Sequence, residues 1–564
     1  MNTITGRAAF IELLEREGVS HLFGNPGTTE LPIMAALAGA SSLDYVLGLQ
    51  ESLVVAMADG YARASGKLTA CNVHVAPGLG NAMGALYNAK WVGSPVIVTA
   101  GQQEQGHGLT EPLLYDPLVP IAAPLVKWAV EITRIEDLPR IVHRAAKVAM
   151  TPPTGPVFLS LPGDILNDRA ALELGEATRV DAMTRPSDAA LARLTERLLA
   201  AKRPVIISGH EVAMADTLDD AAKLAELLGA PVFQQTVPHG AHFRSEHRAF
   251  MGALTRDQKQ VRETLEPYDL LICLGADVLR MSVYSPVDPL PPGLPVVQIG
   301  LRDWEMGKNY PAEIALRSEI GETLRALLPI VEAHRSPEFA SAAEEALVEL
   351  ESRNWTAKRA QLREKTLTGA QTSPMDPALL MLRIVEALPP DAVVVDEGIL
   401  STRALHAFLP FRDARCFYGL ASGGIGFALP GAIGIQLAQP ERPVVAIVGD
   451  GSAMYSIQAL WTAAHLKRPI TYVIANNSSY RILKERLRAF HGSNDFIGMD
   501  LKNPPIDFVG LARSMGLKAQ RITEPDDIDP AVREATASGG PSLLEVIVDD
   551  GFSSARAYPR FSQT

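Results

Sequence analysis

Short apolar runs rich in β-branched residues alternate with amphipathic helical stretches in three separate regions of the chain. The first region, up to about residue 182, contains LDYVLGL (43–49), LTACNVHV (68–75), SPVIVTA (94–100) and PVFLSLP (156–162). Strands that alternate with helices in this way form parallel sheets with helices packed on both faces. The pattern therefore predicts an α/β protein with three doubly wound parallel-sheet domains.

The same alternation of strands and helices recurs in two later regions, and the three regions together give the expected domain boundaries. We expect domains at residues 1–182, 190–330 and 373–564, the first and third being possible copies of one architecture. Residues 331–372 are highly charged, have a helical pattern and end near Thr-Gly and Ser-Pro, so they are interpreted as a helical connector.

Composition excludes several classes of protein. The 564 residues carry a formal net charge of −12, and no Lys/Arg block offers a surface for nucleic acid. Three widely spaced cysteines suit buried free thiols in a reducing compartment. No signal peptide or transmembrane segment is recognised, so a cytoplasmic protein without a membrane partner is expected.

One carboxylate stands in an unusual place. In VVAIVGDGSA (444–453), Asp450 follows an apolar strand and lies between two glycines, and 27 positions later Asn477 follows the next expected strand. That spacing fits one β-turn-helix-β crossover, so both side chains should lie at the carboxyl ends of parallel strands. Either motif alone is more often structural, but together they suit an oxygen-liking cation such as Mg²⁺ beside a diphosphate.

The GDGS and NN motifs resemble the fingerprint of the thiamine-diphosphate-dependent 2-oxo acid decarboxylase and acetolactate synthase superfamily. The resemblance implies thiamine diphosphate and Mg²⁺ as cofactors and a chain ordered as pyrimidine-binding, middle and diphosphate-binding domains. It makes Asp450, Asn477 and the backbone carbonyl of Ser479 the metal ligands. It also implies cofactor contacts at Gly423, Ile425, Gly449, Gly451, Ser452 and Tyr480.

A second motif, LGLQESLVVAMADGYARASGK (47–67), resembles the segment around the superfamily's essential glutamate, here Glu51. Alone, Glu51 would be interpreted as a carboxylate that stabilises a helix N-terminus. The resemblance instead implies that Glu51 exchanges a proton with the aminopyrimidine ring of the cofactor. In this superfamily that glutamate and the metal site come from different subunits, so a homodimer at minimum, and commonly a homotetramer, is expected.

Within the superfamily the sequence most resembles benzoylformate decarboxylases, through LFGNPGTTELP, NVHVAPGLGNAMGALYNA and ASGGIGFALPGAIGIQLAQPER. The resemblance implies that His74 moves protons and that Thr28 contacts the substrate carboxylate. Alternatively, His74 is a structural histidine and Thr28 is a helix N-cap. Leu113 and Leu114 match an apolar pocket wall, although core leucines are common. Ser282 replaces a second active-site histidine of that family.

A basic run departs from that family's pattern. Arg481, Lys484, Arg486 and Arg488 stand where those decarboxylases have apolar residues near the substrate entrance. We weigh a solvated helix face balanced by Glu485 against recognition of an extra anionic group on the substrate.

The predicted function is decarboxylation of a small-molecule 2-oxo acid through an enamine intermediate, with release of CO₂ and an aldehyde. An acetolactate-synthase-like carboligase and an acyl-CoA lyase are alternatives within the superfamily. A non-catalytic thiamine diphosphate sensor is a further alternative, which Glu51 disfavours. Whether FAD or a nucleotide binds the middle domain stays open.

Overall fold

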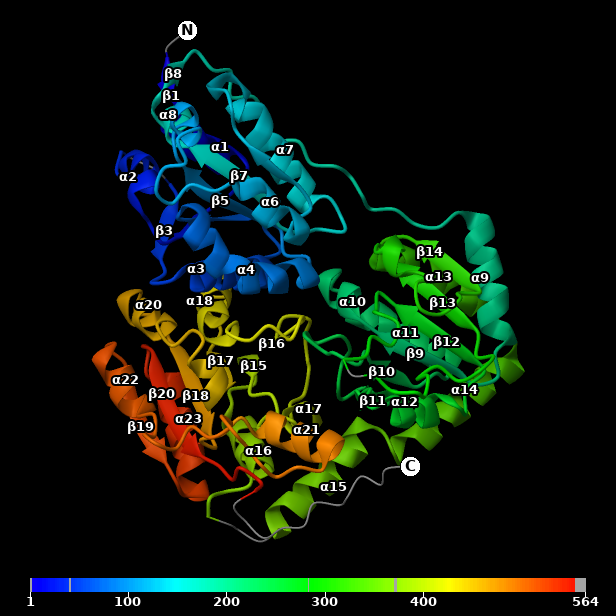
Figure 1. The fold of residues 1–564 in the computed structure, drawn as a ribbon. Helices are drawn as coiled ribbons and strands as arrows, with labels where there is room; N and C mark the ends of the chain where they lie inside the picture. The colour runs from blue at the N-terminus through cyan, green and yellow to red at the C-terminus, as the bar shows by residue number, and fades with distance from the viewer. Residues whose placement is uncertain (1–2, 40–41, 283, 370–372, 553–564) are drawn as a thin grey trace. The chain divides into compact units, whose positions relative to one another are not determined.

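The computed structural model describes residues 3–39, 42–282, 284–369 and 373–552 (Figure 1). These residues form three six-stranded sheets and a two-stranded pair of β1 (Ile4–Thr5) with β8 (Arg169–Ala170). The chain divides into two compact units. One comprises Met1–Val180, Gln371–Arg403 and Leu420–Thr564, and the other comprises Asp181–Ala370 and Ala404–Gly419. The predicted α/β class with three parallel-sheet domains is confirmed.

The N-terminal sheet is parallel throughout and has the order β3-β2-β4-β5-β7-β6. Its strands are β2 (His21–Gly24), β3 (Asp44–Leu47), β4 (Thr69–Val73), β5 (Val96–Gln102), β6 (Ala129–Glu131) and β7 (Val157–Pro162). Alternate residues of β7 face α1 (Gly6–Arg16) and α7 (Leu138–Met150), which cover one face (Figure 1). The other face is covered by α3 (Glu51–Ser65), α4 (Val75–Val92) and α6 (Leu118–Ala122).

The C-terminal sheet repeats this plan. Within the first unit its strands run in the order β15 (Val393–Glu397), β17 (Val444–Gly449), β18 (Ile470–Asn476), β20 (Ser542–Ile547) and β19 (Lys518–Ile522), all parallel. Numbered in chain order within the domain, with β16 (Phe417–Gly419) as the second strand, these strands are the first, third, fourth, sixth and fifth. The corresponding strands of the N-terminal sheet, from β2 to β6, follow one another in the same order. The two domains therefore share one architecture, as the sequence suggested.

Helices complete this part of the first unit. They are α16 (Pro377–Ala387), α18 (Ala428–Ala438), α19 (Asp450–Ala453), α20 (Ala459–His465), α21 (Arg481–His491), α22 (Phe508–Ser514) and α23 (Ile528–Ala537). The helical part of the crossover expected between Asp450 and Asn477 is interrupted, because the chain makes turns between α19 and α20. In the N-terminal sheet, sequence inspection found the strands β3, β4, β5 and β7 and missed β2 and β6.

Glycines allow α3 and α18 to pack backbone against backbone. A Cβ atom on Gly434 would lie 2.0 Å from the Met57 carbonyl oxygen, and one on Gly60 would lie 2.3 Å from the Gly431 carbonyl oxygen. Real Cβ atoms do not approach other atoms this closely, so only glycine fits at either position. The contact ties the helix that begins at Glu51 to the helix that follows the Gly423–Ile425 loop.

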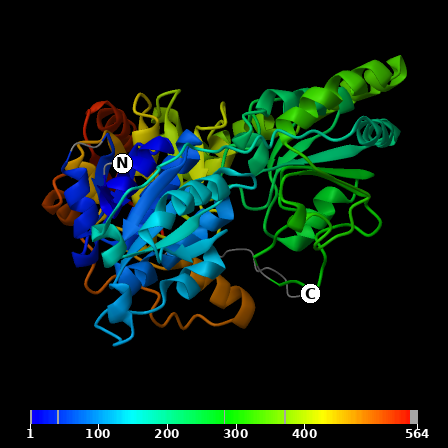
Figure 2. The same cartoon turned by 90° about the horizontal axis from the view of Figure 1, so that it is seen from above.

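The second unit contains a parallel sheet with the order β11-β10-β9-β12-β13-β14, and Figure 2 shows helices on both sides of these strands. The strands are β9 (Pro204–Ser208), β10 (Val232–Gln234), β11 (Phe250–Ala253), β12 (Leu270–Leu274), β13 (Val296–Gly300) and β14 (Ile314–Arg317). The chain direction across the sheet reverses between β9 and β12. In open α/β sheets, ligands bind at the carboxyl ends of strands beside such a reversal.

The helices of the second unit are α9 (Asp188–Ala200), α10 (His210–Met214), α11 (Leu218–Leu228), α12 (Gln258–Leu265), α13 (Ile320–His334), α14 (Pro337–Glu351), α15 (Trp355–Thr368) and α17 (Leu405–Phe408). The expected connector, residues 331–372, contains α14 and α15, and its last three residues lie outside the described residues. Among the helices described, none has the length and apolar character needed to span a membrane. All three cysteines are buried free thiols.

Candidate active site

Three neighbouring strands of the N-terminal sheet bring the expected catalytic residues to one edge. Glu51 begins α3 after β3, the Thr28–Glu30 turn follows β2, and His74 follows β4. Because β3, β2 and β4 are adjacent and parallel, their carboxyl ends lie side by side. The tertiary structure thus gathers residues that are up to 46 positions apart in the sequence.

Glu51 is a buried carboxyl group, 8% exposed. Asn81 donates a hydrogen bond to its Oε2 at 3.0 Å, and Asn25 donates a longer one to its Oε1 at 3.4 Å. Gly78 leaves room for the group, since a Cβ atom there would lie 3.0 Å from Oε1. These neutral amide donors orient the carboxyl without supplying a counter-charge.

His74 is held by an acidic partner that the sequence analysis did not identify. Its Nδ1 lies 2.7 Å from Oε2 of Glu30, which is fully buried, and 3.1 Å from Oγ1 of Thr29. Glu30 also accepts hydrogen bonds from the backbone N–H groups of Gly27 and Gly101, both at 2.9 Å. The carboxylate therefore places the proton on Nδ1 and leaves Nε2 of the imidazole for chemistry.

The other expected substrate contacts lie nearer to the surface. Thr28 is exposed, and it is not the N-cap of the turn, because Gly27 occupies that position. Thr29, its neighbour, makes the contact with His74. Leu113 and Leu114 are 86% and 40% exposed, so they are not core residues of this chain.

The expected metal ligands meet at the carboxyl ends of β17 and β18. Asp450 begins α19 directly after β17, and Asn477 and Ser479 follow β18, its parallel neighbour. All three are buried, at 4%, 8% and 4% exposed. Asp450 Oδ2 accepts the backbone N–H of Ser479 at 3.2 Å, and Oδ1 accepts that of Gly451 at 2.8 Å.

These residues fit a hard divalent cation. Within the described part of the chain, Asn477 Oδ1 and Ser479 Oγ are buried and make no hydrogen bond. A buried acceptor without a donor is costly, and a cation would satisfy it. Burial raises the pKa of Asp450 to about 6, although backbone N–H donors oppose the shift. A bound cation would reverse this effect and favour the carboxylate.

Glycine keeps the Asp450 turn compact. A Cβ atom on Gly451 would lie 2.5 Å from the ring of Tyr480, so that ring packs directly against the turn. Ser452 is 8% exposed in the same short helix. A Cβ on Gly449 would meet only ordinary contacts, the nearest atom being 3.7 Å away.

A buried glutamate anchors the loop that precedes α18. Glu397, at the end of β15, accepts backbone N–H groups of Gly426 at 2.5 Å and Ala428 at 2.6 Å. Burial raises its pKa to about 7, although these N–H donors oppose the shift. The loop holds Gly423, which is exposed with φ +84°, and the half-buried Ile425. Glu397 thus positions both expected cofactor contacts.

The basic run on α21 is divided between structural and exposed side chains. Lys484 is buried and its Nζ lies 2.6 Å from Asp500 Oδ1, and Arg481 pairs with Glu485 at 3.1 Å. Arg486 and Arg488 are exposed. The solvated-face interpretation therefore does not describe Lys484, which is buried and pairs with the exposed Asp500. Ser282 is exposed in the second unit.

Sequence reasoning missed Glu30, Thr29 and Glu397. Glu30 had a local signal, since a glutamate three residues after a helix N-cap typifies a capping box, and this one bonds the Gly27 N–H. Glu397 stands at the end of an apolar strand, much as Asp450 follows one. No second motif elsewhere in the sequence identified Glu397 as a functional residue.

Comparisons with known proteins show the family of the chain. Family models described as the N-terminal TPP binding, central and C-terminal TPP binding domains of thiamine pyrophosphate enzymes match residues 4–112, 191–327 and 400–546. Benzoylformate decarboxylase from Pseudomonas aeruginosa is 35% identical over 96% of this chain and 98% of its own length. An acetolactate synthase catalytic subunit from Aspergillus candidus is 27% identical over 97% of this chain and 80% of its own.

Solved structures are similar over the same extent. The 4-hydroxybenzoylformate decarboxylase of Rhodococcus jostii RHA1 has a TM-score of 0.86 and 33% identity, covering 97% of this chain and 99% of that one. Benzoylformate decarboxylase from Polynucleobacter necessarius has a TM-score of 0.86 and 30% identity, with the same coverage. The chain belongs to the thiamine pyrophosphate enzyme family.

Proposed function

We propose that the protein is a Mg²⁺- and thiamine-diphosphate-dependent lyase that decarboxylates a 2-oxo acid, releasing CO₂ and an aldehyde. The observation that carries this proposal is the buried Glu51 carboxyl at the same sheet edge as the His74–Glu30 pair. A protein that only held the cofactor would need neither a buried acid nor an oriented imidazole. The similarity to benzoylformate decarboxylases supports the choice of reaction.

When bound, thiamine diphosphate would supply a carbon nucleophile for the 2-oxo carbon of the acid and an electron sink for the electron pair left on that carbon when the carboxylate leaves as CO₂. Glu51 holds a proton toward the aminopyrimidine ring, and Asn81 and Asn25 fix the direction in which its carboxyl points. Gly423 and Ile425 on the loop anchored by Glu397 position the cofactor's rings. Asp450, Asn477 and Ser479 hold Mg²⁺ and, through it, the diphosphate.

His74 delivers and removes protons at the substrate. Glu30 keeps Nδ1 protonated, so Nε2 exchanges protons with the reacting group. Thr28, exposed beside this pair, offers a hydroxyl to the substrate carboxylate, and Leu113 and Leu114 offer an apolar wall. The exposed leucines also agree with an assembly of at least two copies, in which another subunit completes the site.

The test uses a readout that needs no substrate. In deuterated buffer with Mg²⁺, the wild type should exchange the C2 hydrogen of bound thiamine diphosphate faster than free cofactor does. Glu51→Gln should slow this exchange by roughly 10²–10⁴-fold. Glu136→Gln, at a side chain 58% exposed, is the matched control and should exchange like the wild type. Equal rates in wild type and Glu51→Gln would contradict the assigned role.

A panel of 2-oxo acids identifies the reaction. Release of CO₂ and an aldehyde, for example benzaldehyde from benzoylformate, is the expected result. Acetolactate formed from pyruvate would instead indicate a carboligase, the second candidate. Two observations favour this candidate: Ser282 stands in place of a second active-site histidine, and the chain is similar to acetolactate synthases.

A further inference from the structure

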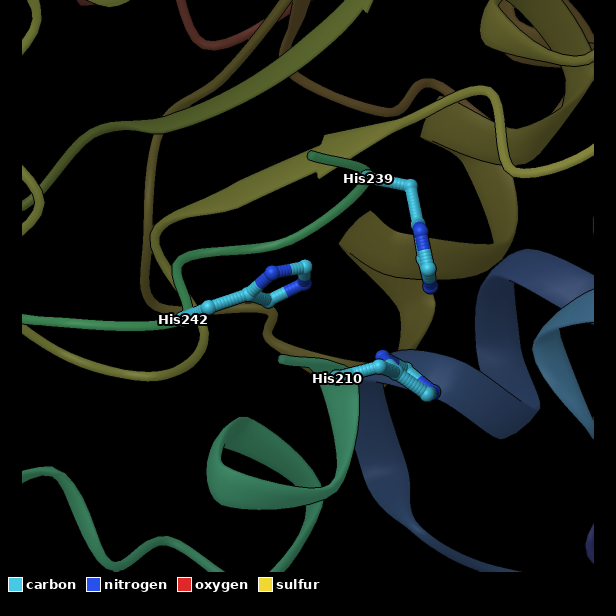
Figure 3. A group of neighbouring side chains, drawn as sticks. All are labelled: His210, His239 and His242. Carbon is cyan, nitrogen blue, oxygen red and sulfur yellow. The ribbon is translucent and has the colours of Figure 1, made fainter. Parts of the chain in front are cut away.

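Three histidines of the second unit point toward one another (Figure 3). His210 is the first residue of α10, directly after β9, and His239 and His242 lie in the segment between β10 and β11. One ring nitrogen of each lies within 4.8 Å of the others. His239 and His242 are 3% and 0% exposed, and His210 is half-buried.

The sheet explains why the three rings meet. β9 and β10 are neighbouring parallel strands, so the residues that follow them emerge at the same edge. The short spacing His-Gly-Ala-His returns the second ring to the same place as the first. The ring centroids lie 4.5 Å apart for His210–His239, 5.3 Å for His239–His242 and 6.1 Å for His210–His242.

Backbone contacts hold the two loop histidines in place. The Gly419 N–H donates to the His239 carbonyl at 3.0 Å, and Ser208 Oγ donates to the His242 carbonyl at 2.6 Å. His239 Nδ1 lies 3.2 Å from the Val237 carbonyl oxygen. A proton on Nδ1 completes that contact and leaves the Nε2 lone pair for a ligand, as in metal sites whose histidines donate their other N–H to a carbonyl.

We propose that His210, His239 and His242 bind a divalent transition-metal ion, with Zn²⁺ as the expected occupant. Imidazole nitrogens suit Zn²⁺, whereas Mg²⁺ prefers oxygen ligands in an octahedral arrangement. Zn–N bonds of about 2.0–2.1 Å in a tetrahedron separate the nitrogens by roughly 3.3 Å. The widest pair must therefore close by about 1.5 Å from its present limit of 4.8 Å.

A polar cavity beside two of the three histidines can supply a fourth coordination position. His210 and His239 line this cavity together with Glu211, Asp277 and Arg302. Three protein ligands and one exchangeable position are typical of a reactive zinc site, whereas structural zinc sites have four protein ligands. The site lies in the second unit, and its existence does not depend on the proposed decarboxylase function.

The experiment measures metal binding by the whole chain. Protein stripped with a chelator is dialysed against Zn²⁺ in excess Mg²⁺ and thiamine diphosphate, so that the Asp450 site is occupied. We expect one Zn²⁺ per chain. His239→Gln and His210→Gln should each weaken its binding at least ~10-fold, whereas His334→Gln, at an exposed histidine of α13, should retain it.

Co²⁺ and X-ray absorption give a readout that does not depend on the variants' folding. Co²⁺ in the wild type should show the intense visible bands of a four-coordinate nitrogen-rich site. Absorption at the zinc edge should show three imidazole ligands. Retention of no more than a trace of Zn²⁺ by folded wild type, or coordination by oxygen alone, overturns the proposal.

Discussion

Replacing Gly434 by alanine tests whether the α3–α18 contact positions the catalytic residues. The new Cβ would lie 2.0 Å from the Met57 carbonyl oxygen and 2.6 Å from the Tyr61 nitrogen. Both atoms belong to the backbone of a helix, so neither can turn aside as a flexible side chain would. The helices must separate by about 1.4 Å to reach an ordinary contact of 3.4 Å.

This separation has two measurable costs. Overpacking of a buried contact costs roughly 1–3 kcal/mol, which corresponds to a fall in Tm of about 2–12 °C for a domain of this size. A displacement of about 1 Å between reacting groups costs roughly 10²-fold in rate. Glu51 begins α3 and the Ile425 loop precedes α18, so moving either helix displaces one of these groups within the cofactor site to which it contributes, and C2 hydrogen exchange of thiamine diphosphate should slow by a comparable factor.

The assays are thermal unfolding and the exchange rate with saturating cofactor. Gly540→Ala is the matched control, because an added methyl there meets no atom within 4 Å and the residue has no positive φ. Its Tm should stay the same or rise slightly. If Gly434→Ala unfolds at the wild-type temperature and exchanges at the wild-type rate, the packing argument is wrong.

Three further changes test other parts of the site. Asp450→Asn should weaken binding of thiamine diphosphate with Mg²⁺ at least ~10-fold by calorimetry, and undiminished binding would exclude Asp450 as a ligand. Glu30→Gln should lower kcat more than KM, because His74 loses the carboxylate that orients its ring; an unchanged kcat would contradict that role. The pKa of Glu397 is raised to about 7 in the folded protein. Between about pH 4.5 and pH 7 the folded state therefore binds a proton that the unfolded state does not. The free energy of unfolding should decline by up to a few kcal/mol as pH rises through this window. Denaturant unfolding should show this decline in the wild type and its absence in Glu397→Gln, and equal pH dependence in both would refute it.

Much of the fold and part of the site followed from local sequence. The long β-branched runs predicted the central strands, because a strand buried on both faces must be apolar along its length. The strand β2 was missed although β3 is equally short and was found, because HLFG runs directly into Asn-Pro-Gly, residues typical of a loop. The GDGS turn and the asparagine pair were readable because each directly ends an apolar strand and one crossover separates them.

Long-range pairings depended on the tertiary structure. Glu30 and His74 are 44 positions apart and meet only because β2 and β4 are neighbours in the sheet. Glu397, at the end of β15, reaches Gly426 and Ala428 at the N-terminal end of α18, 29 and 31 positions away. The three histidines likewise meet because β9 lies beside β10. Sequence alone determined which residues end strands, whereas strand order, set by packing across the whole sheet, decided which of those residues share a site.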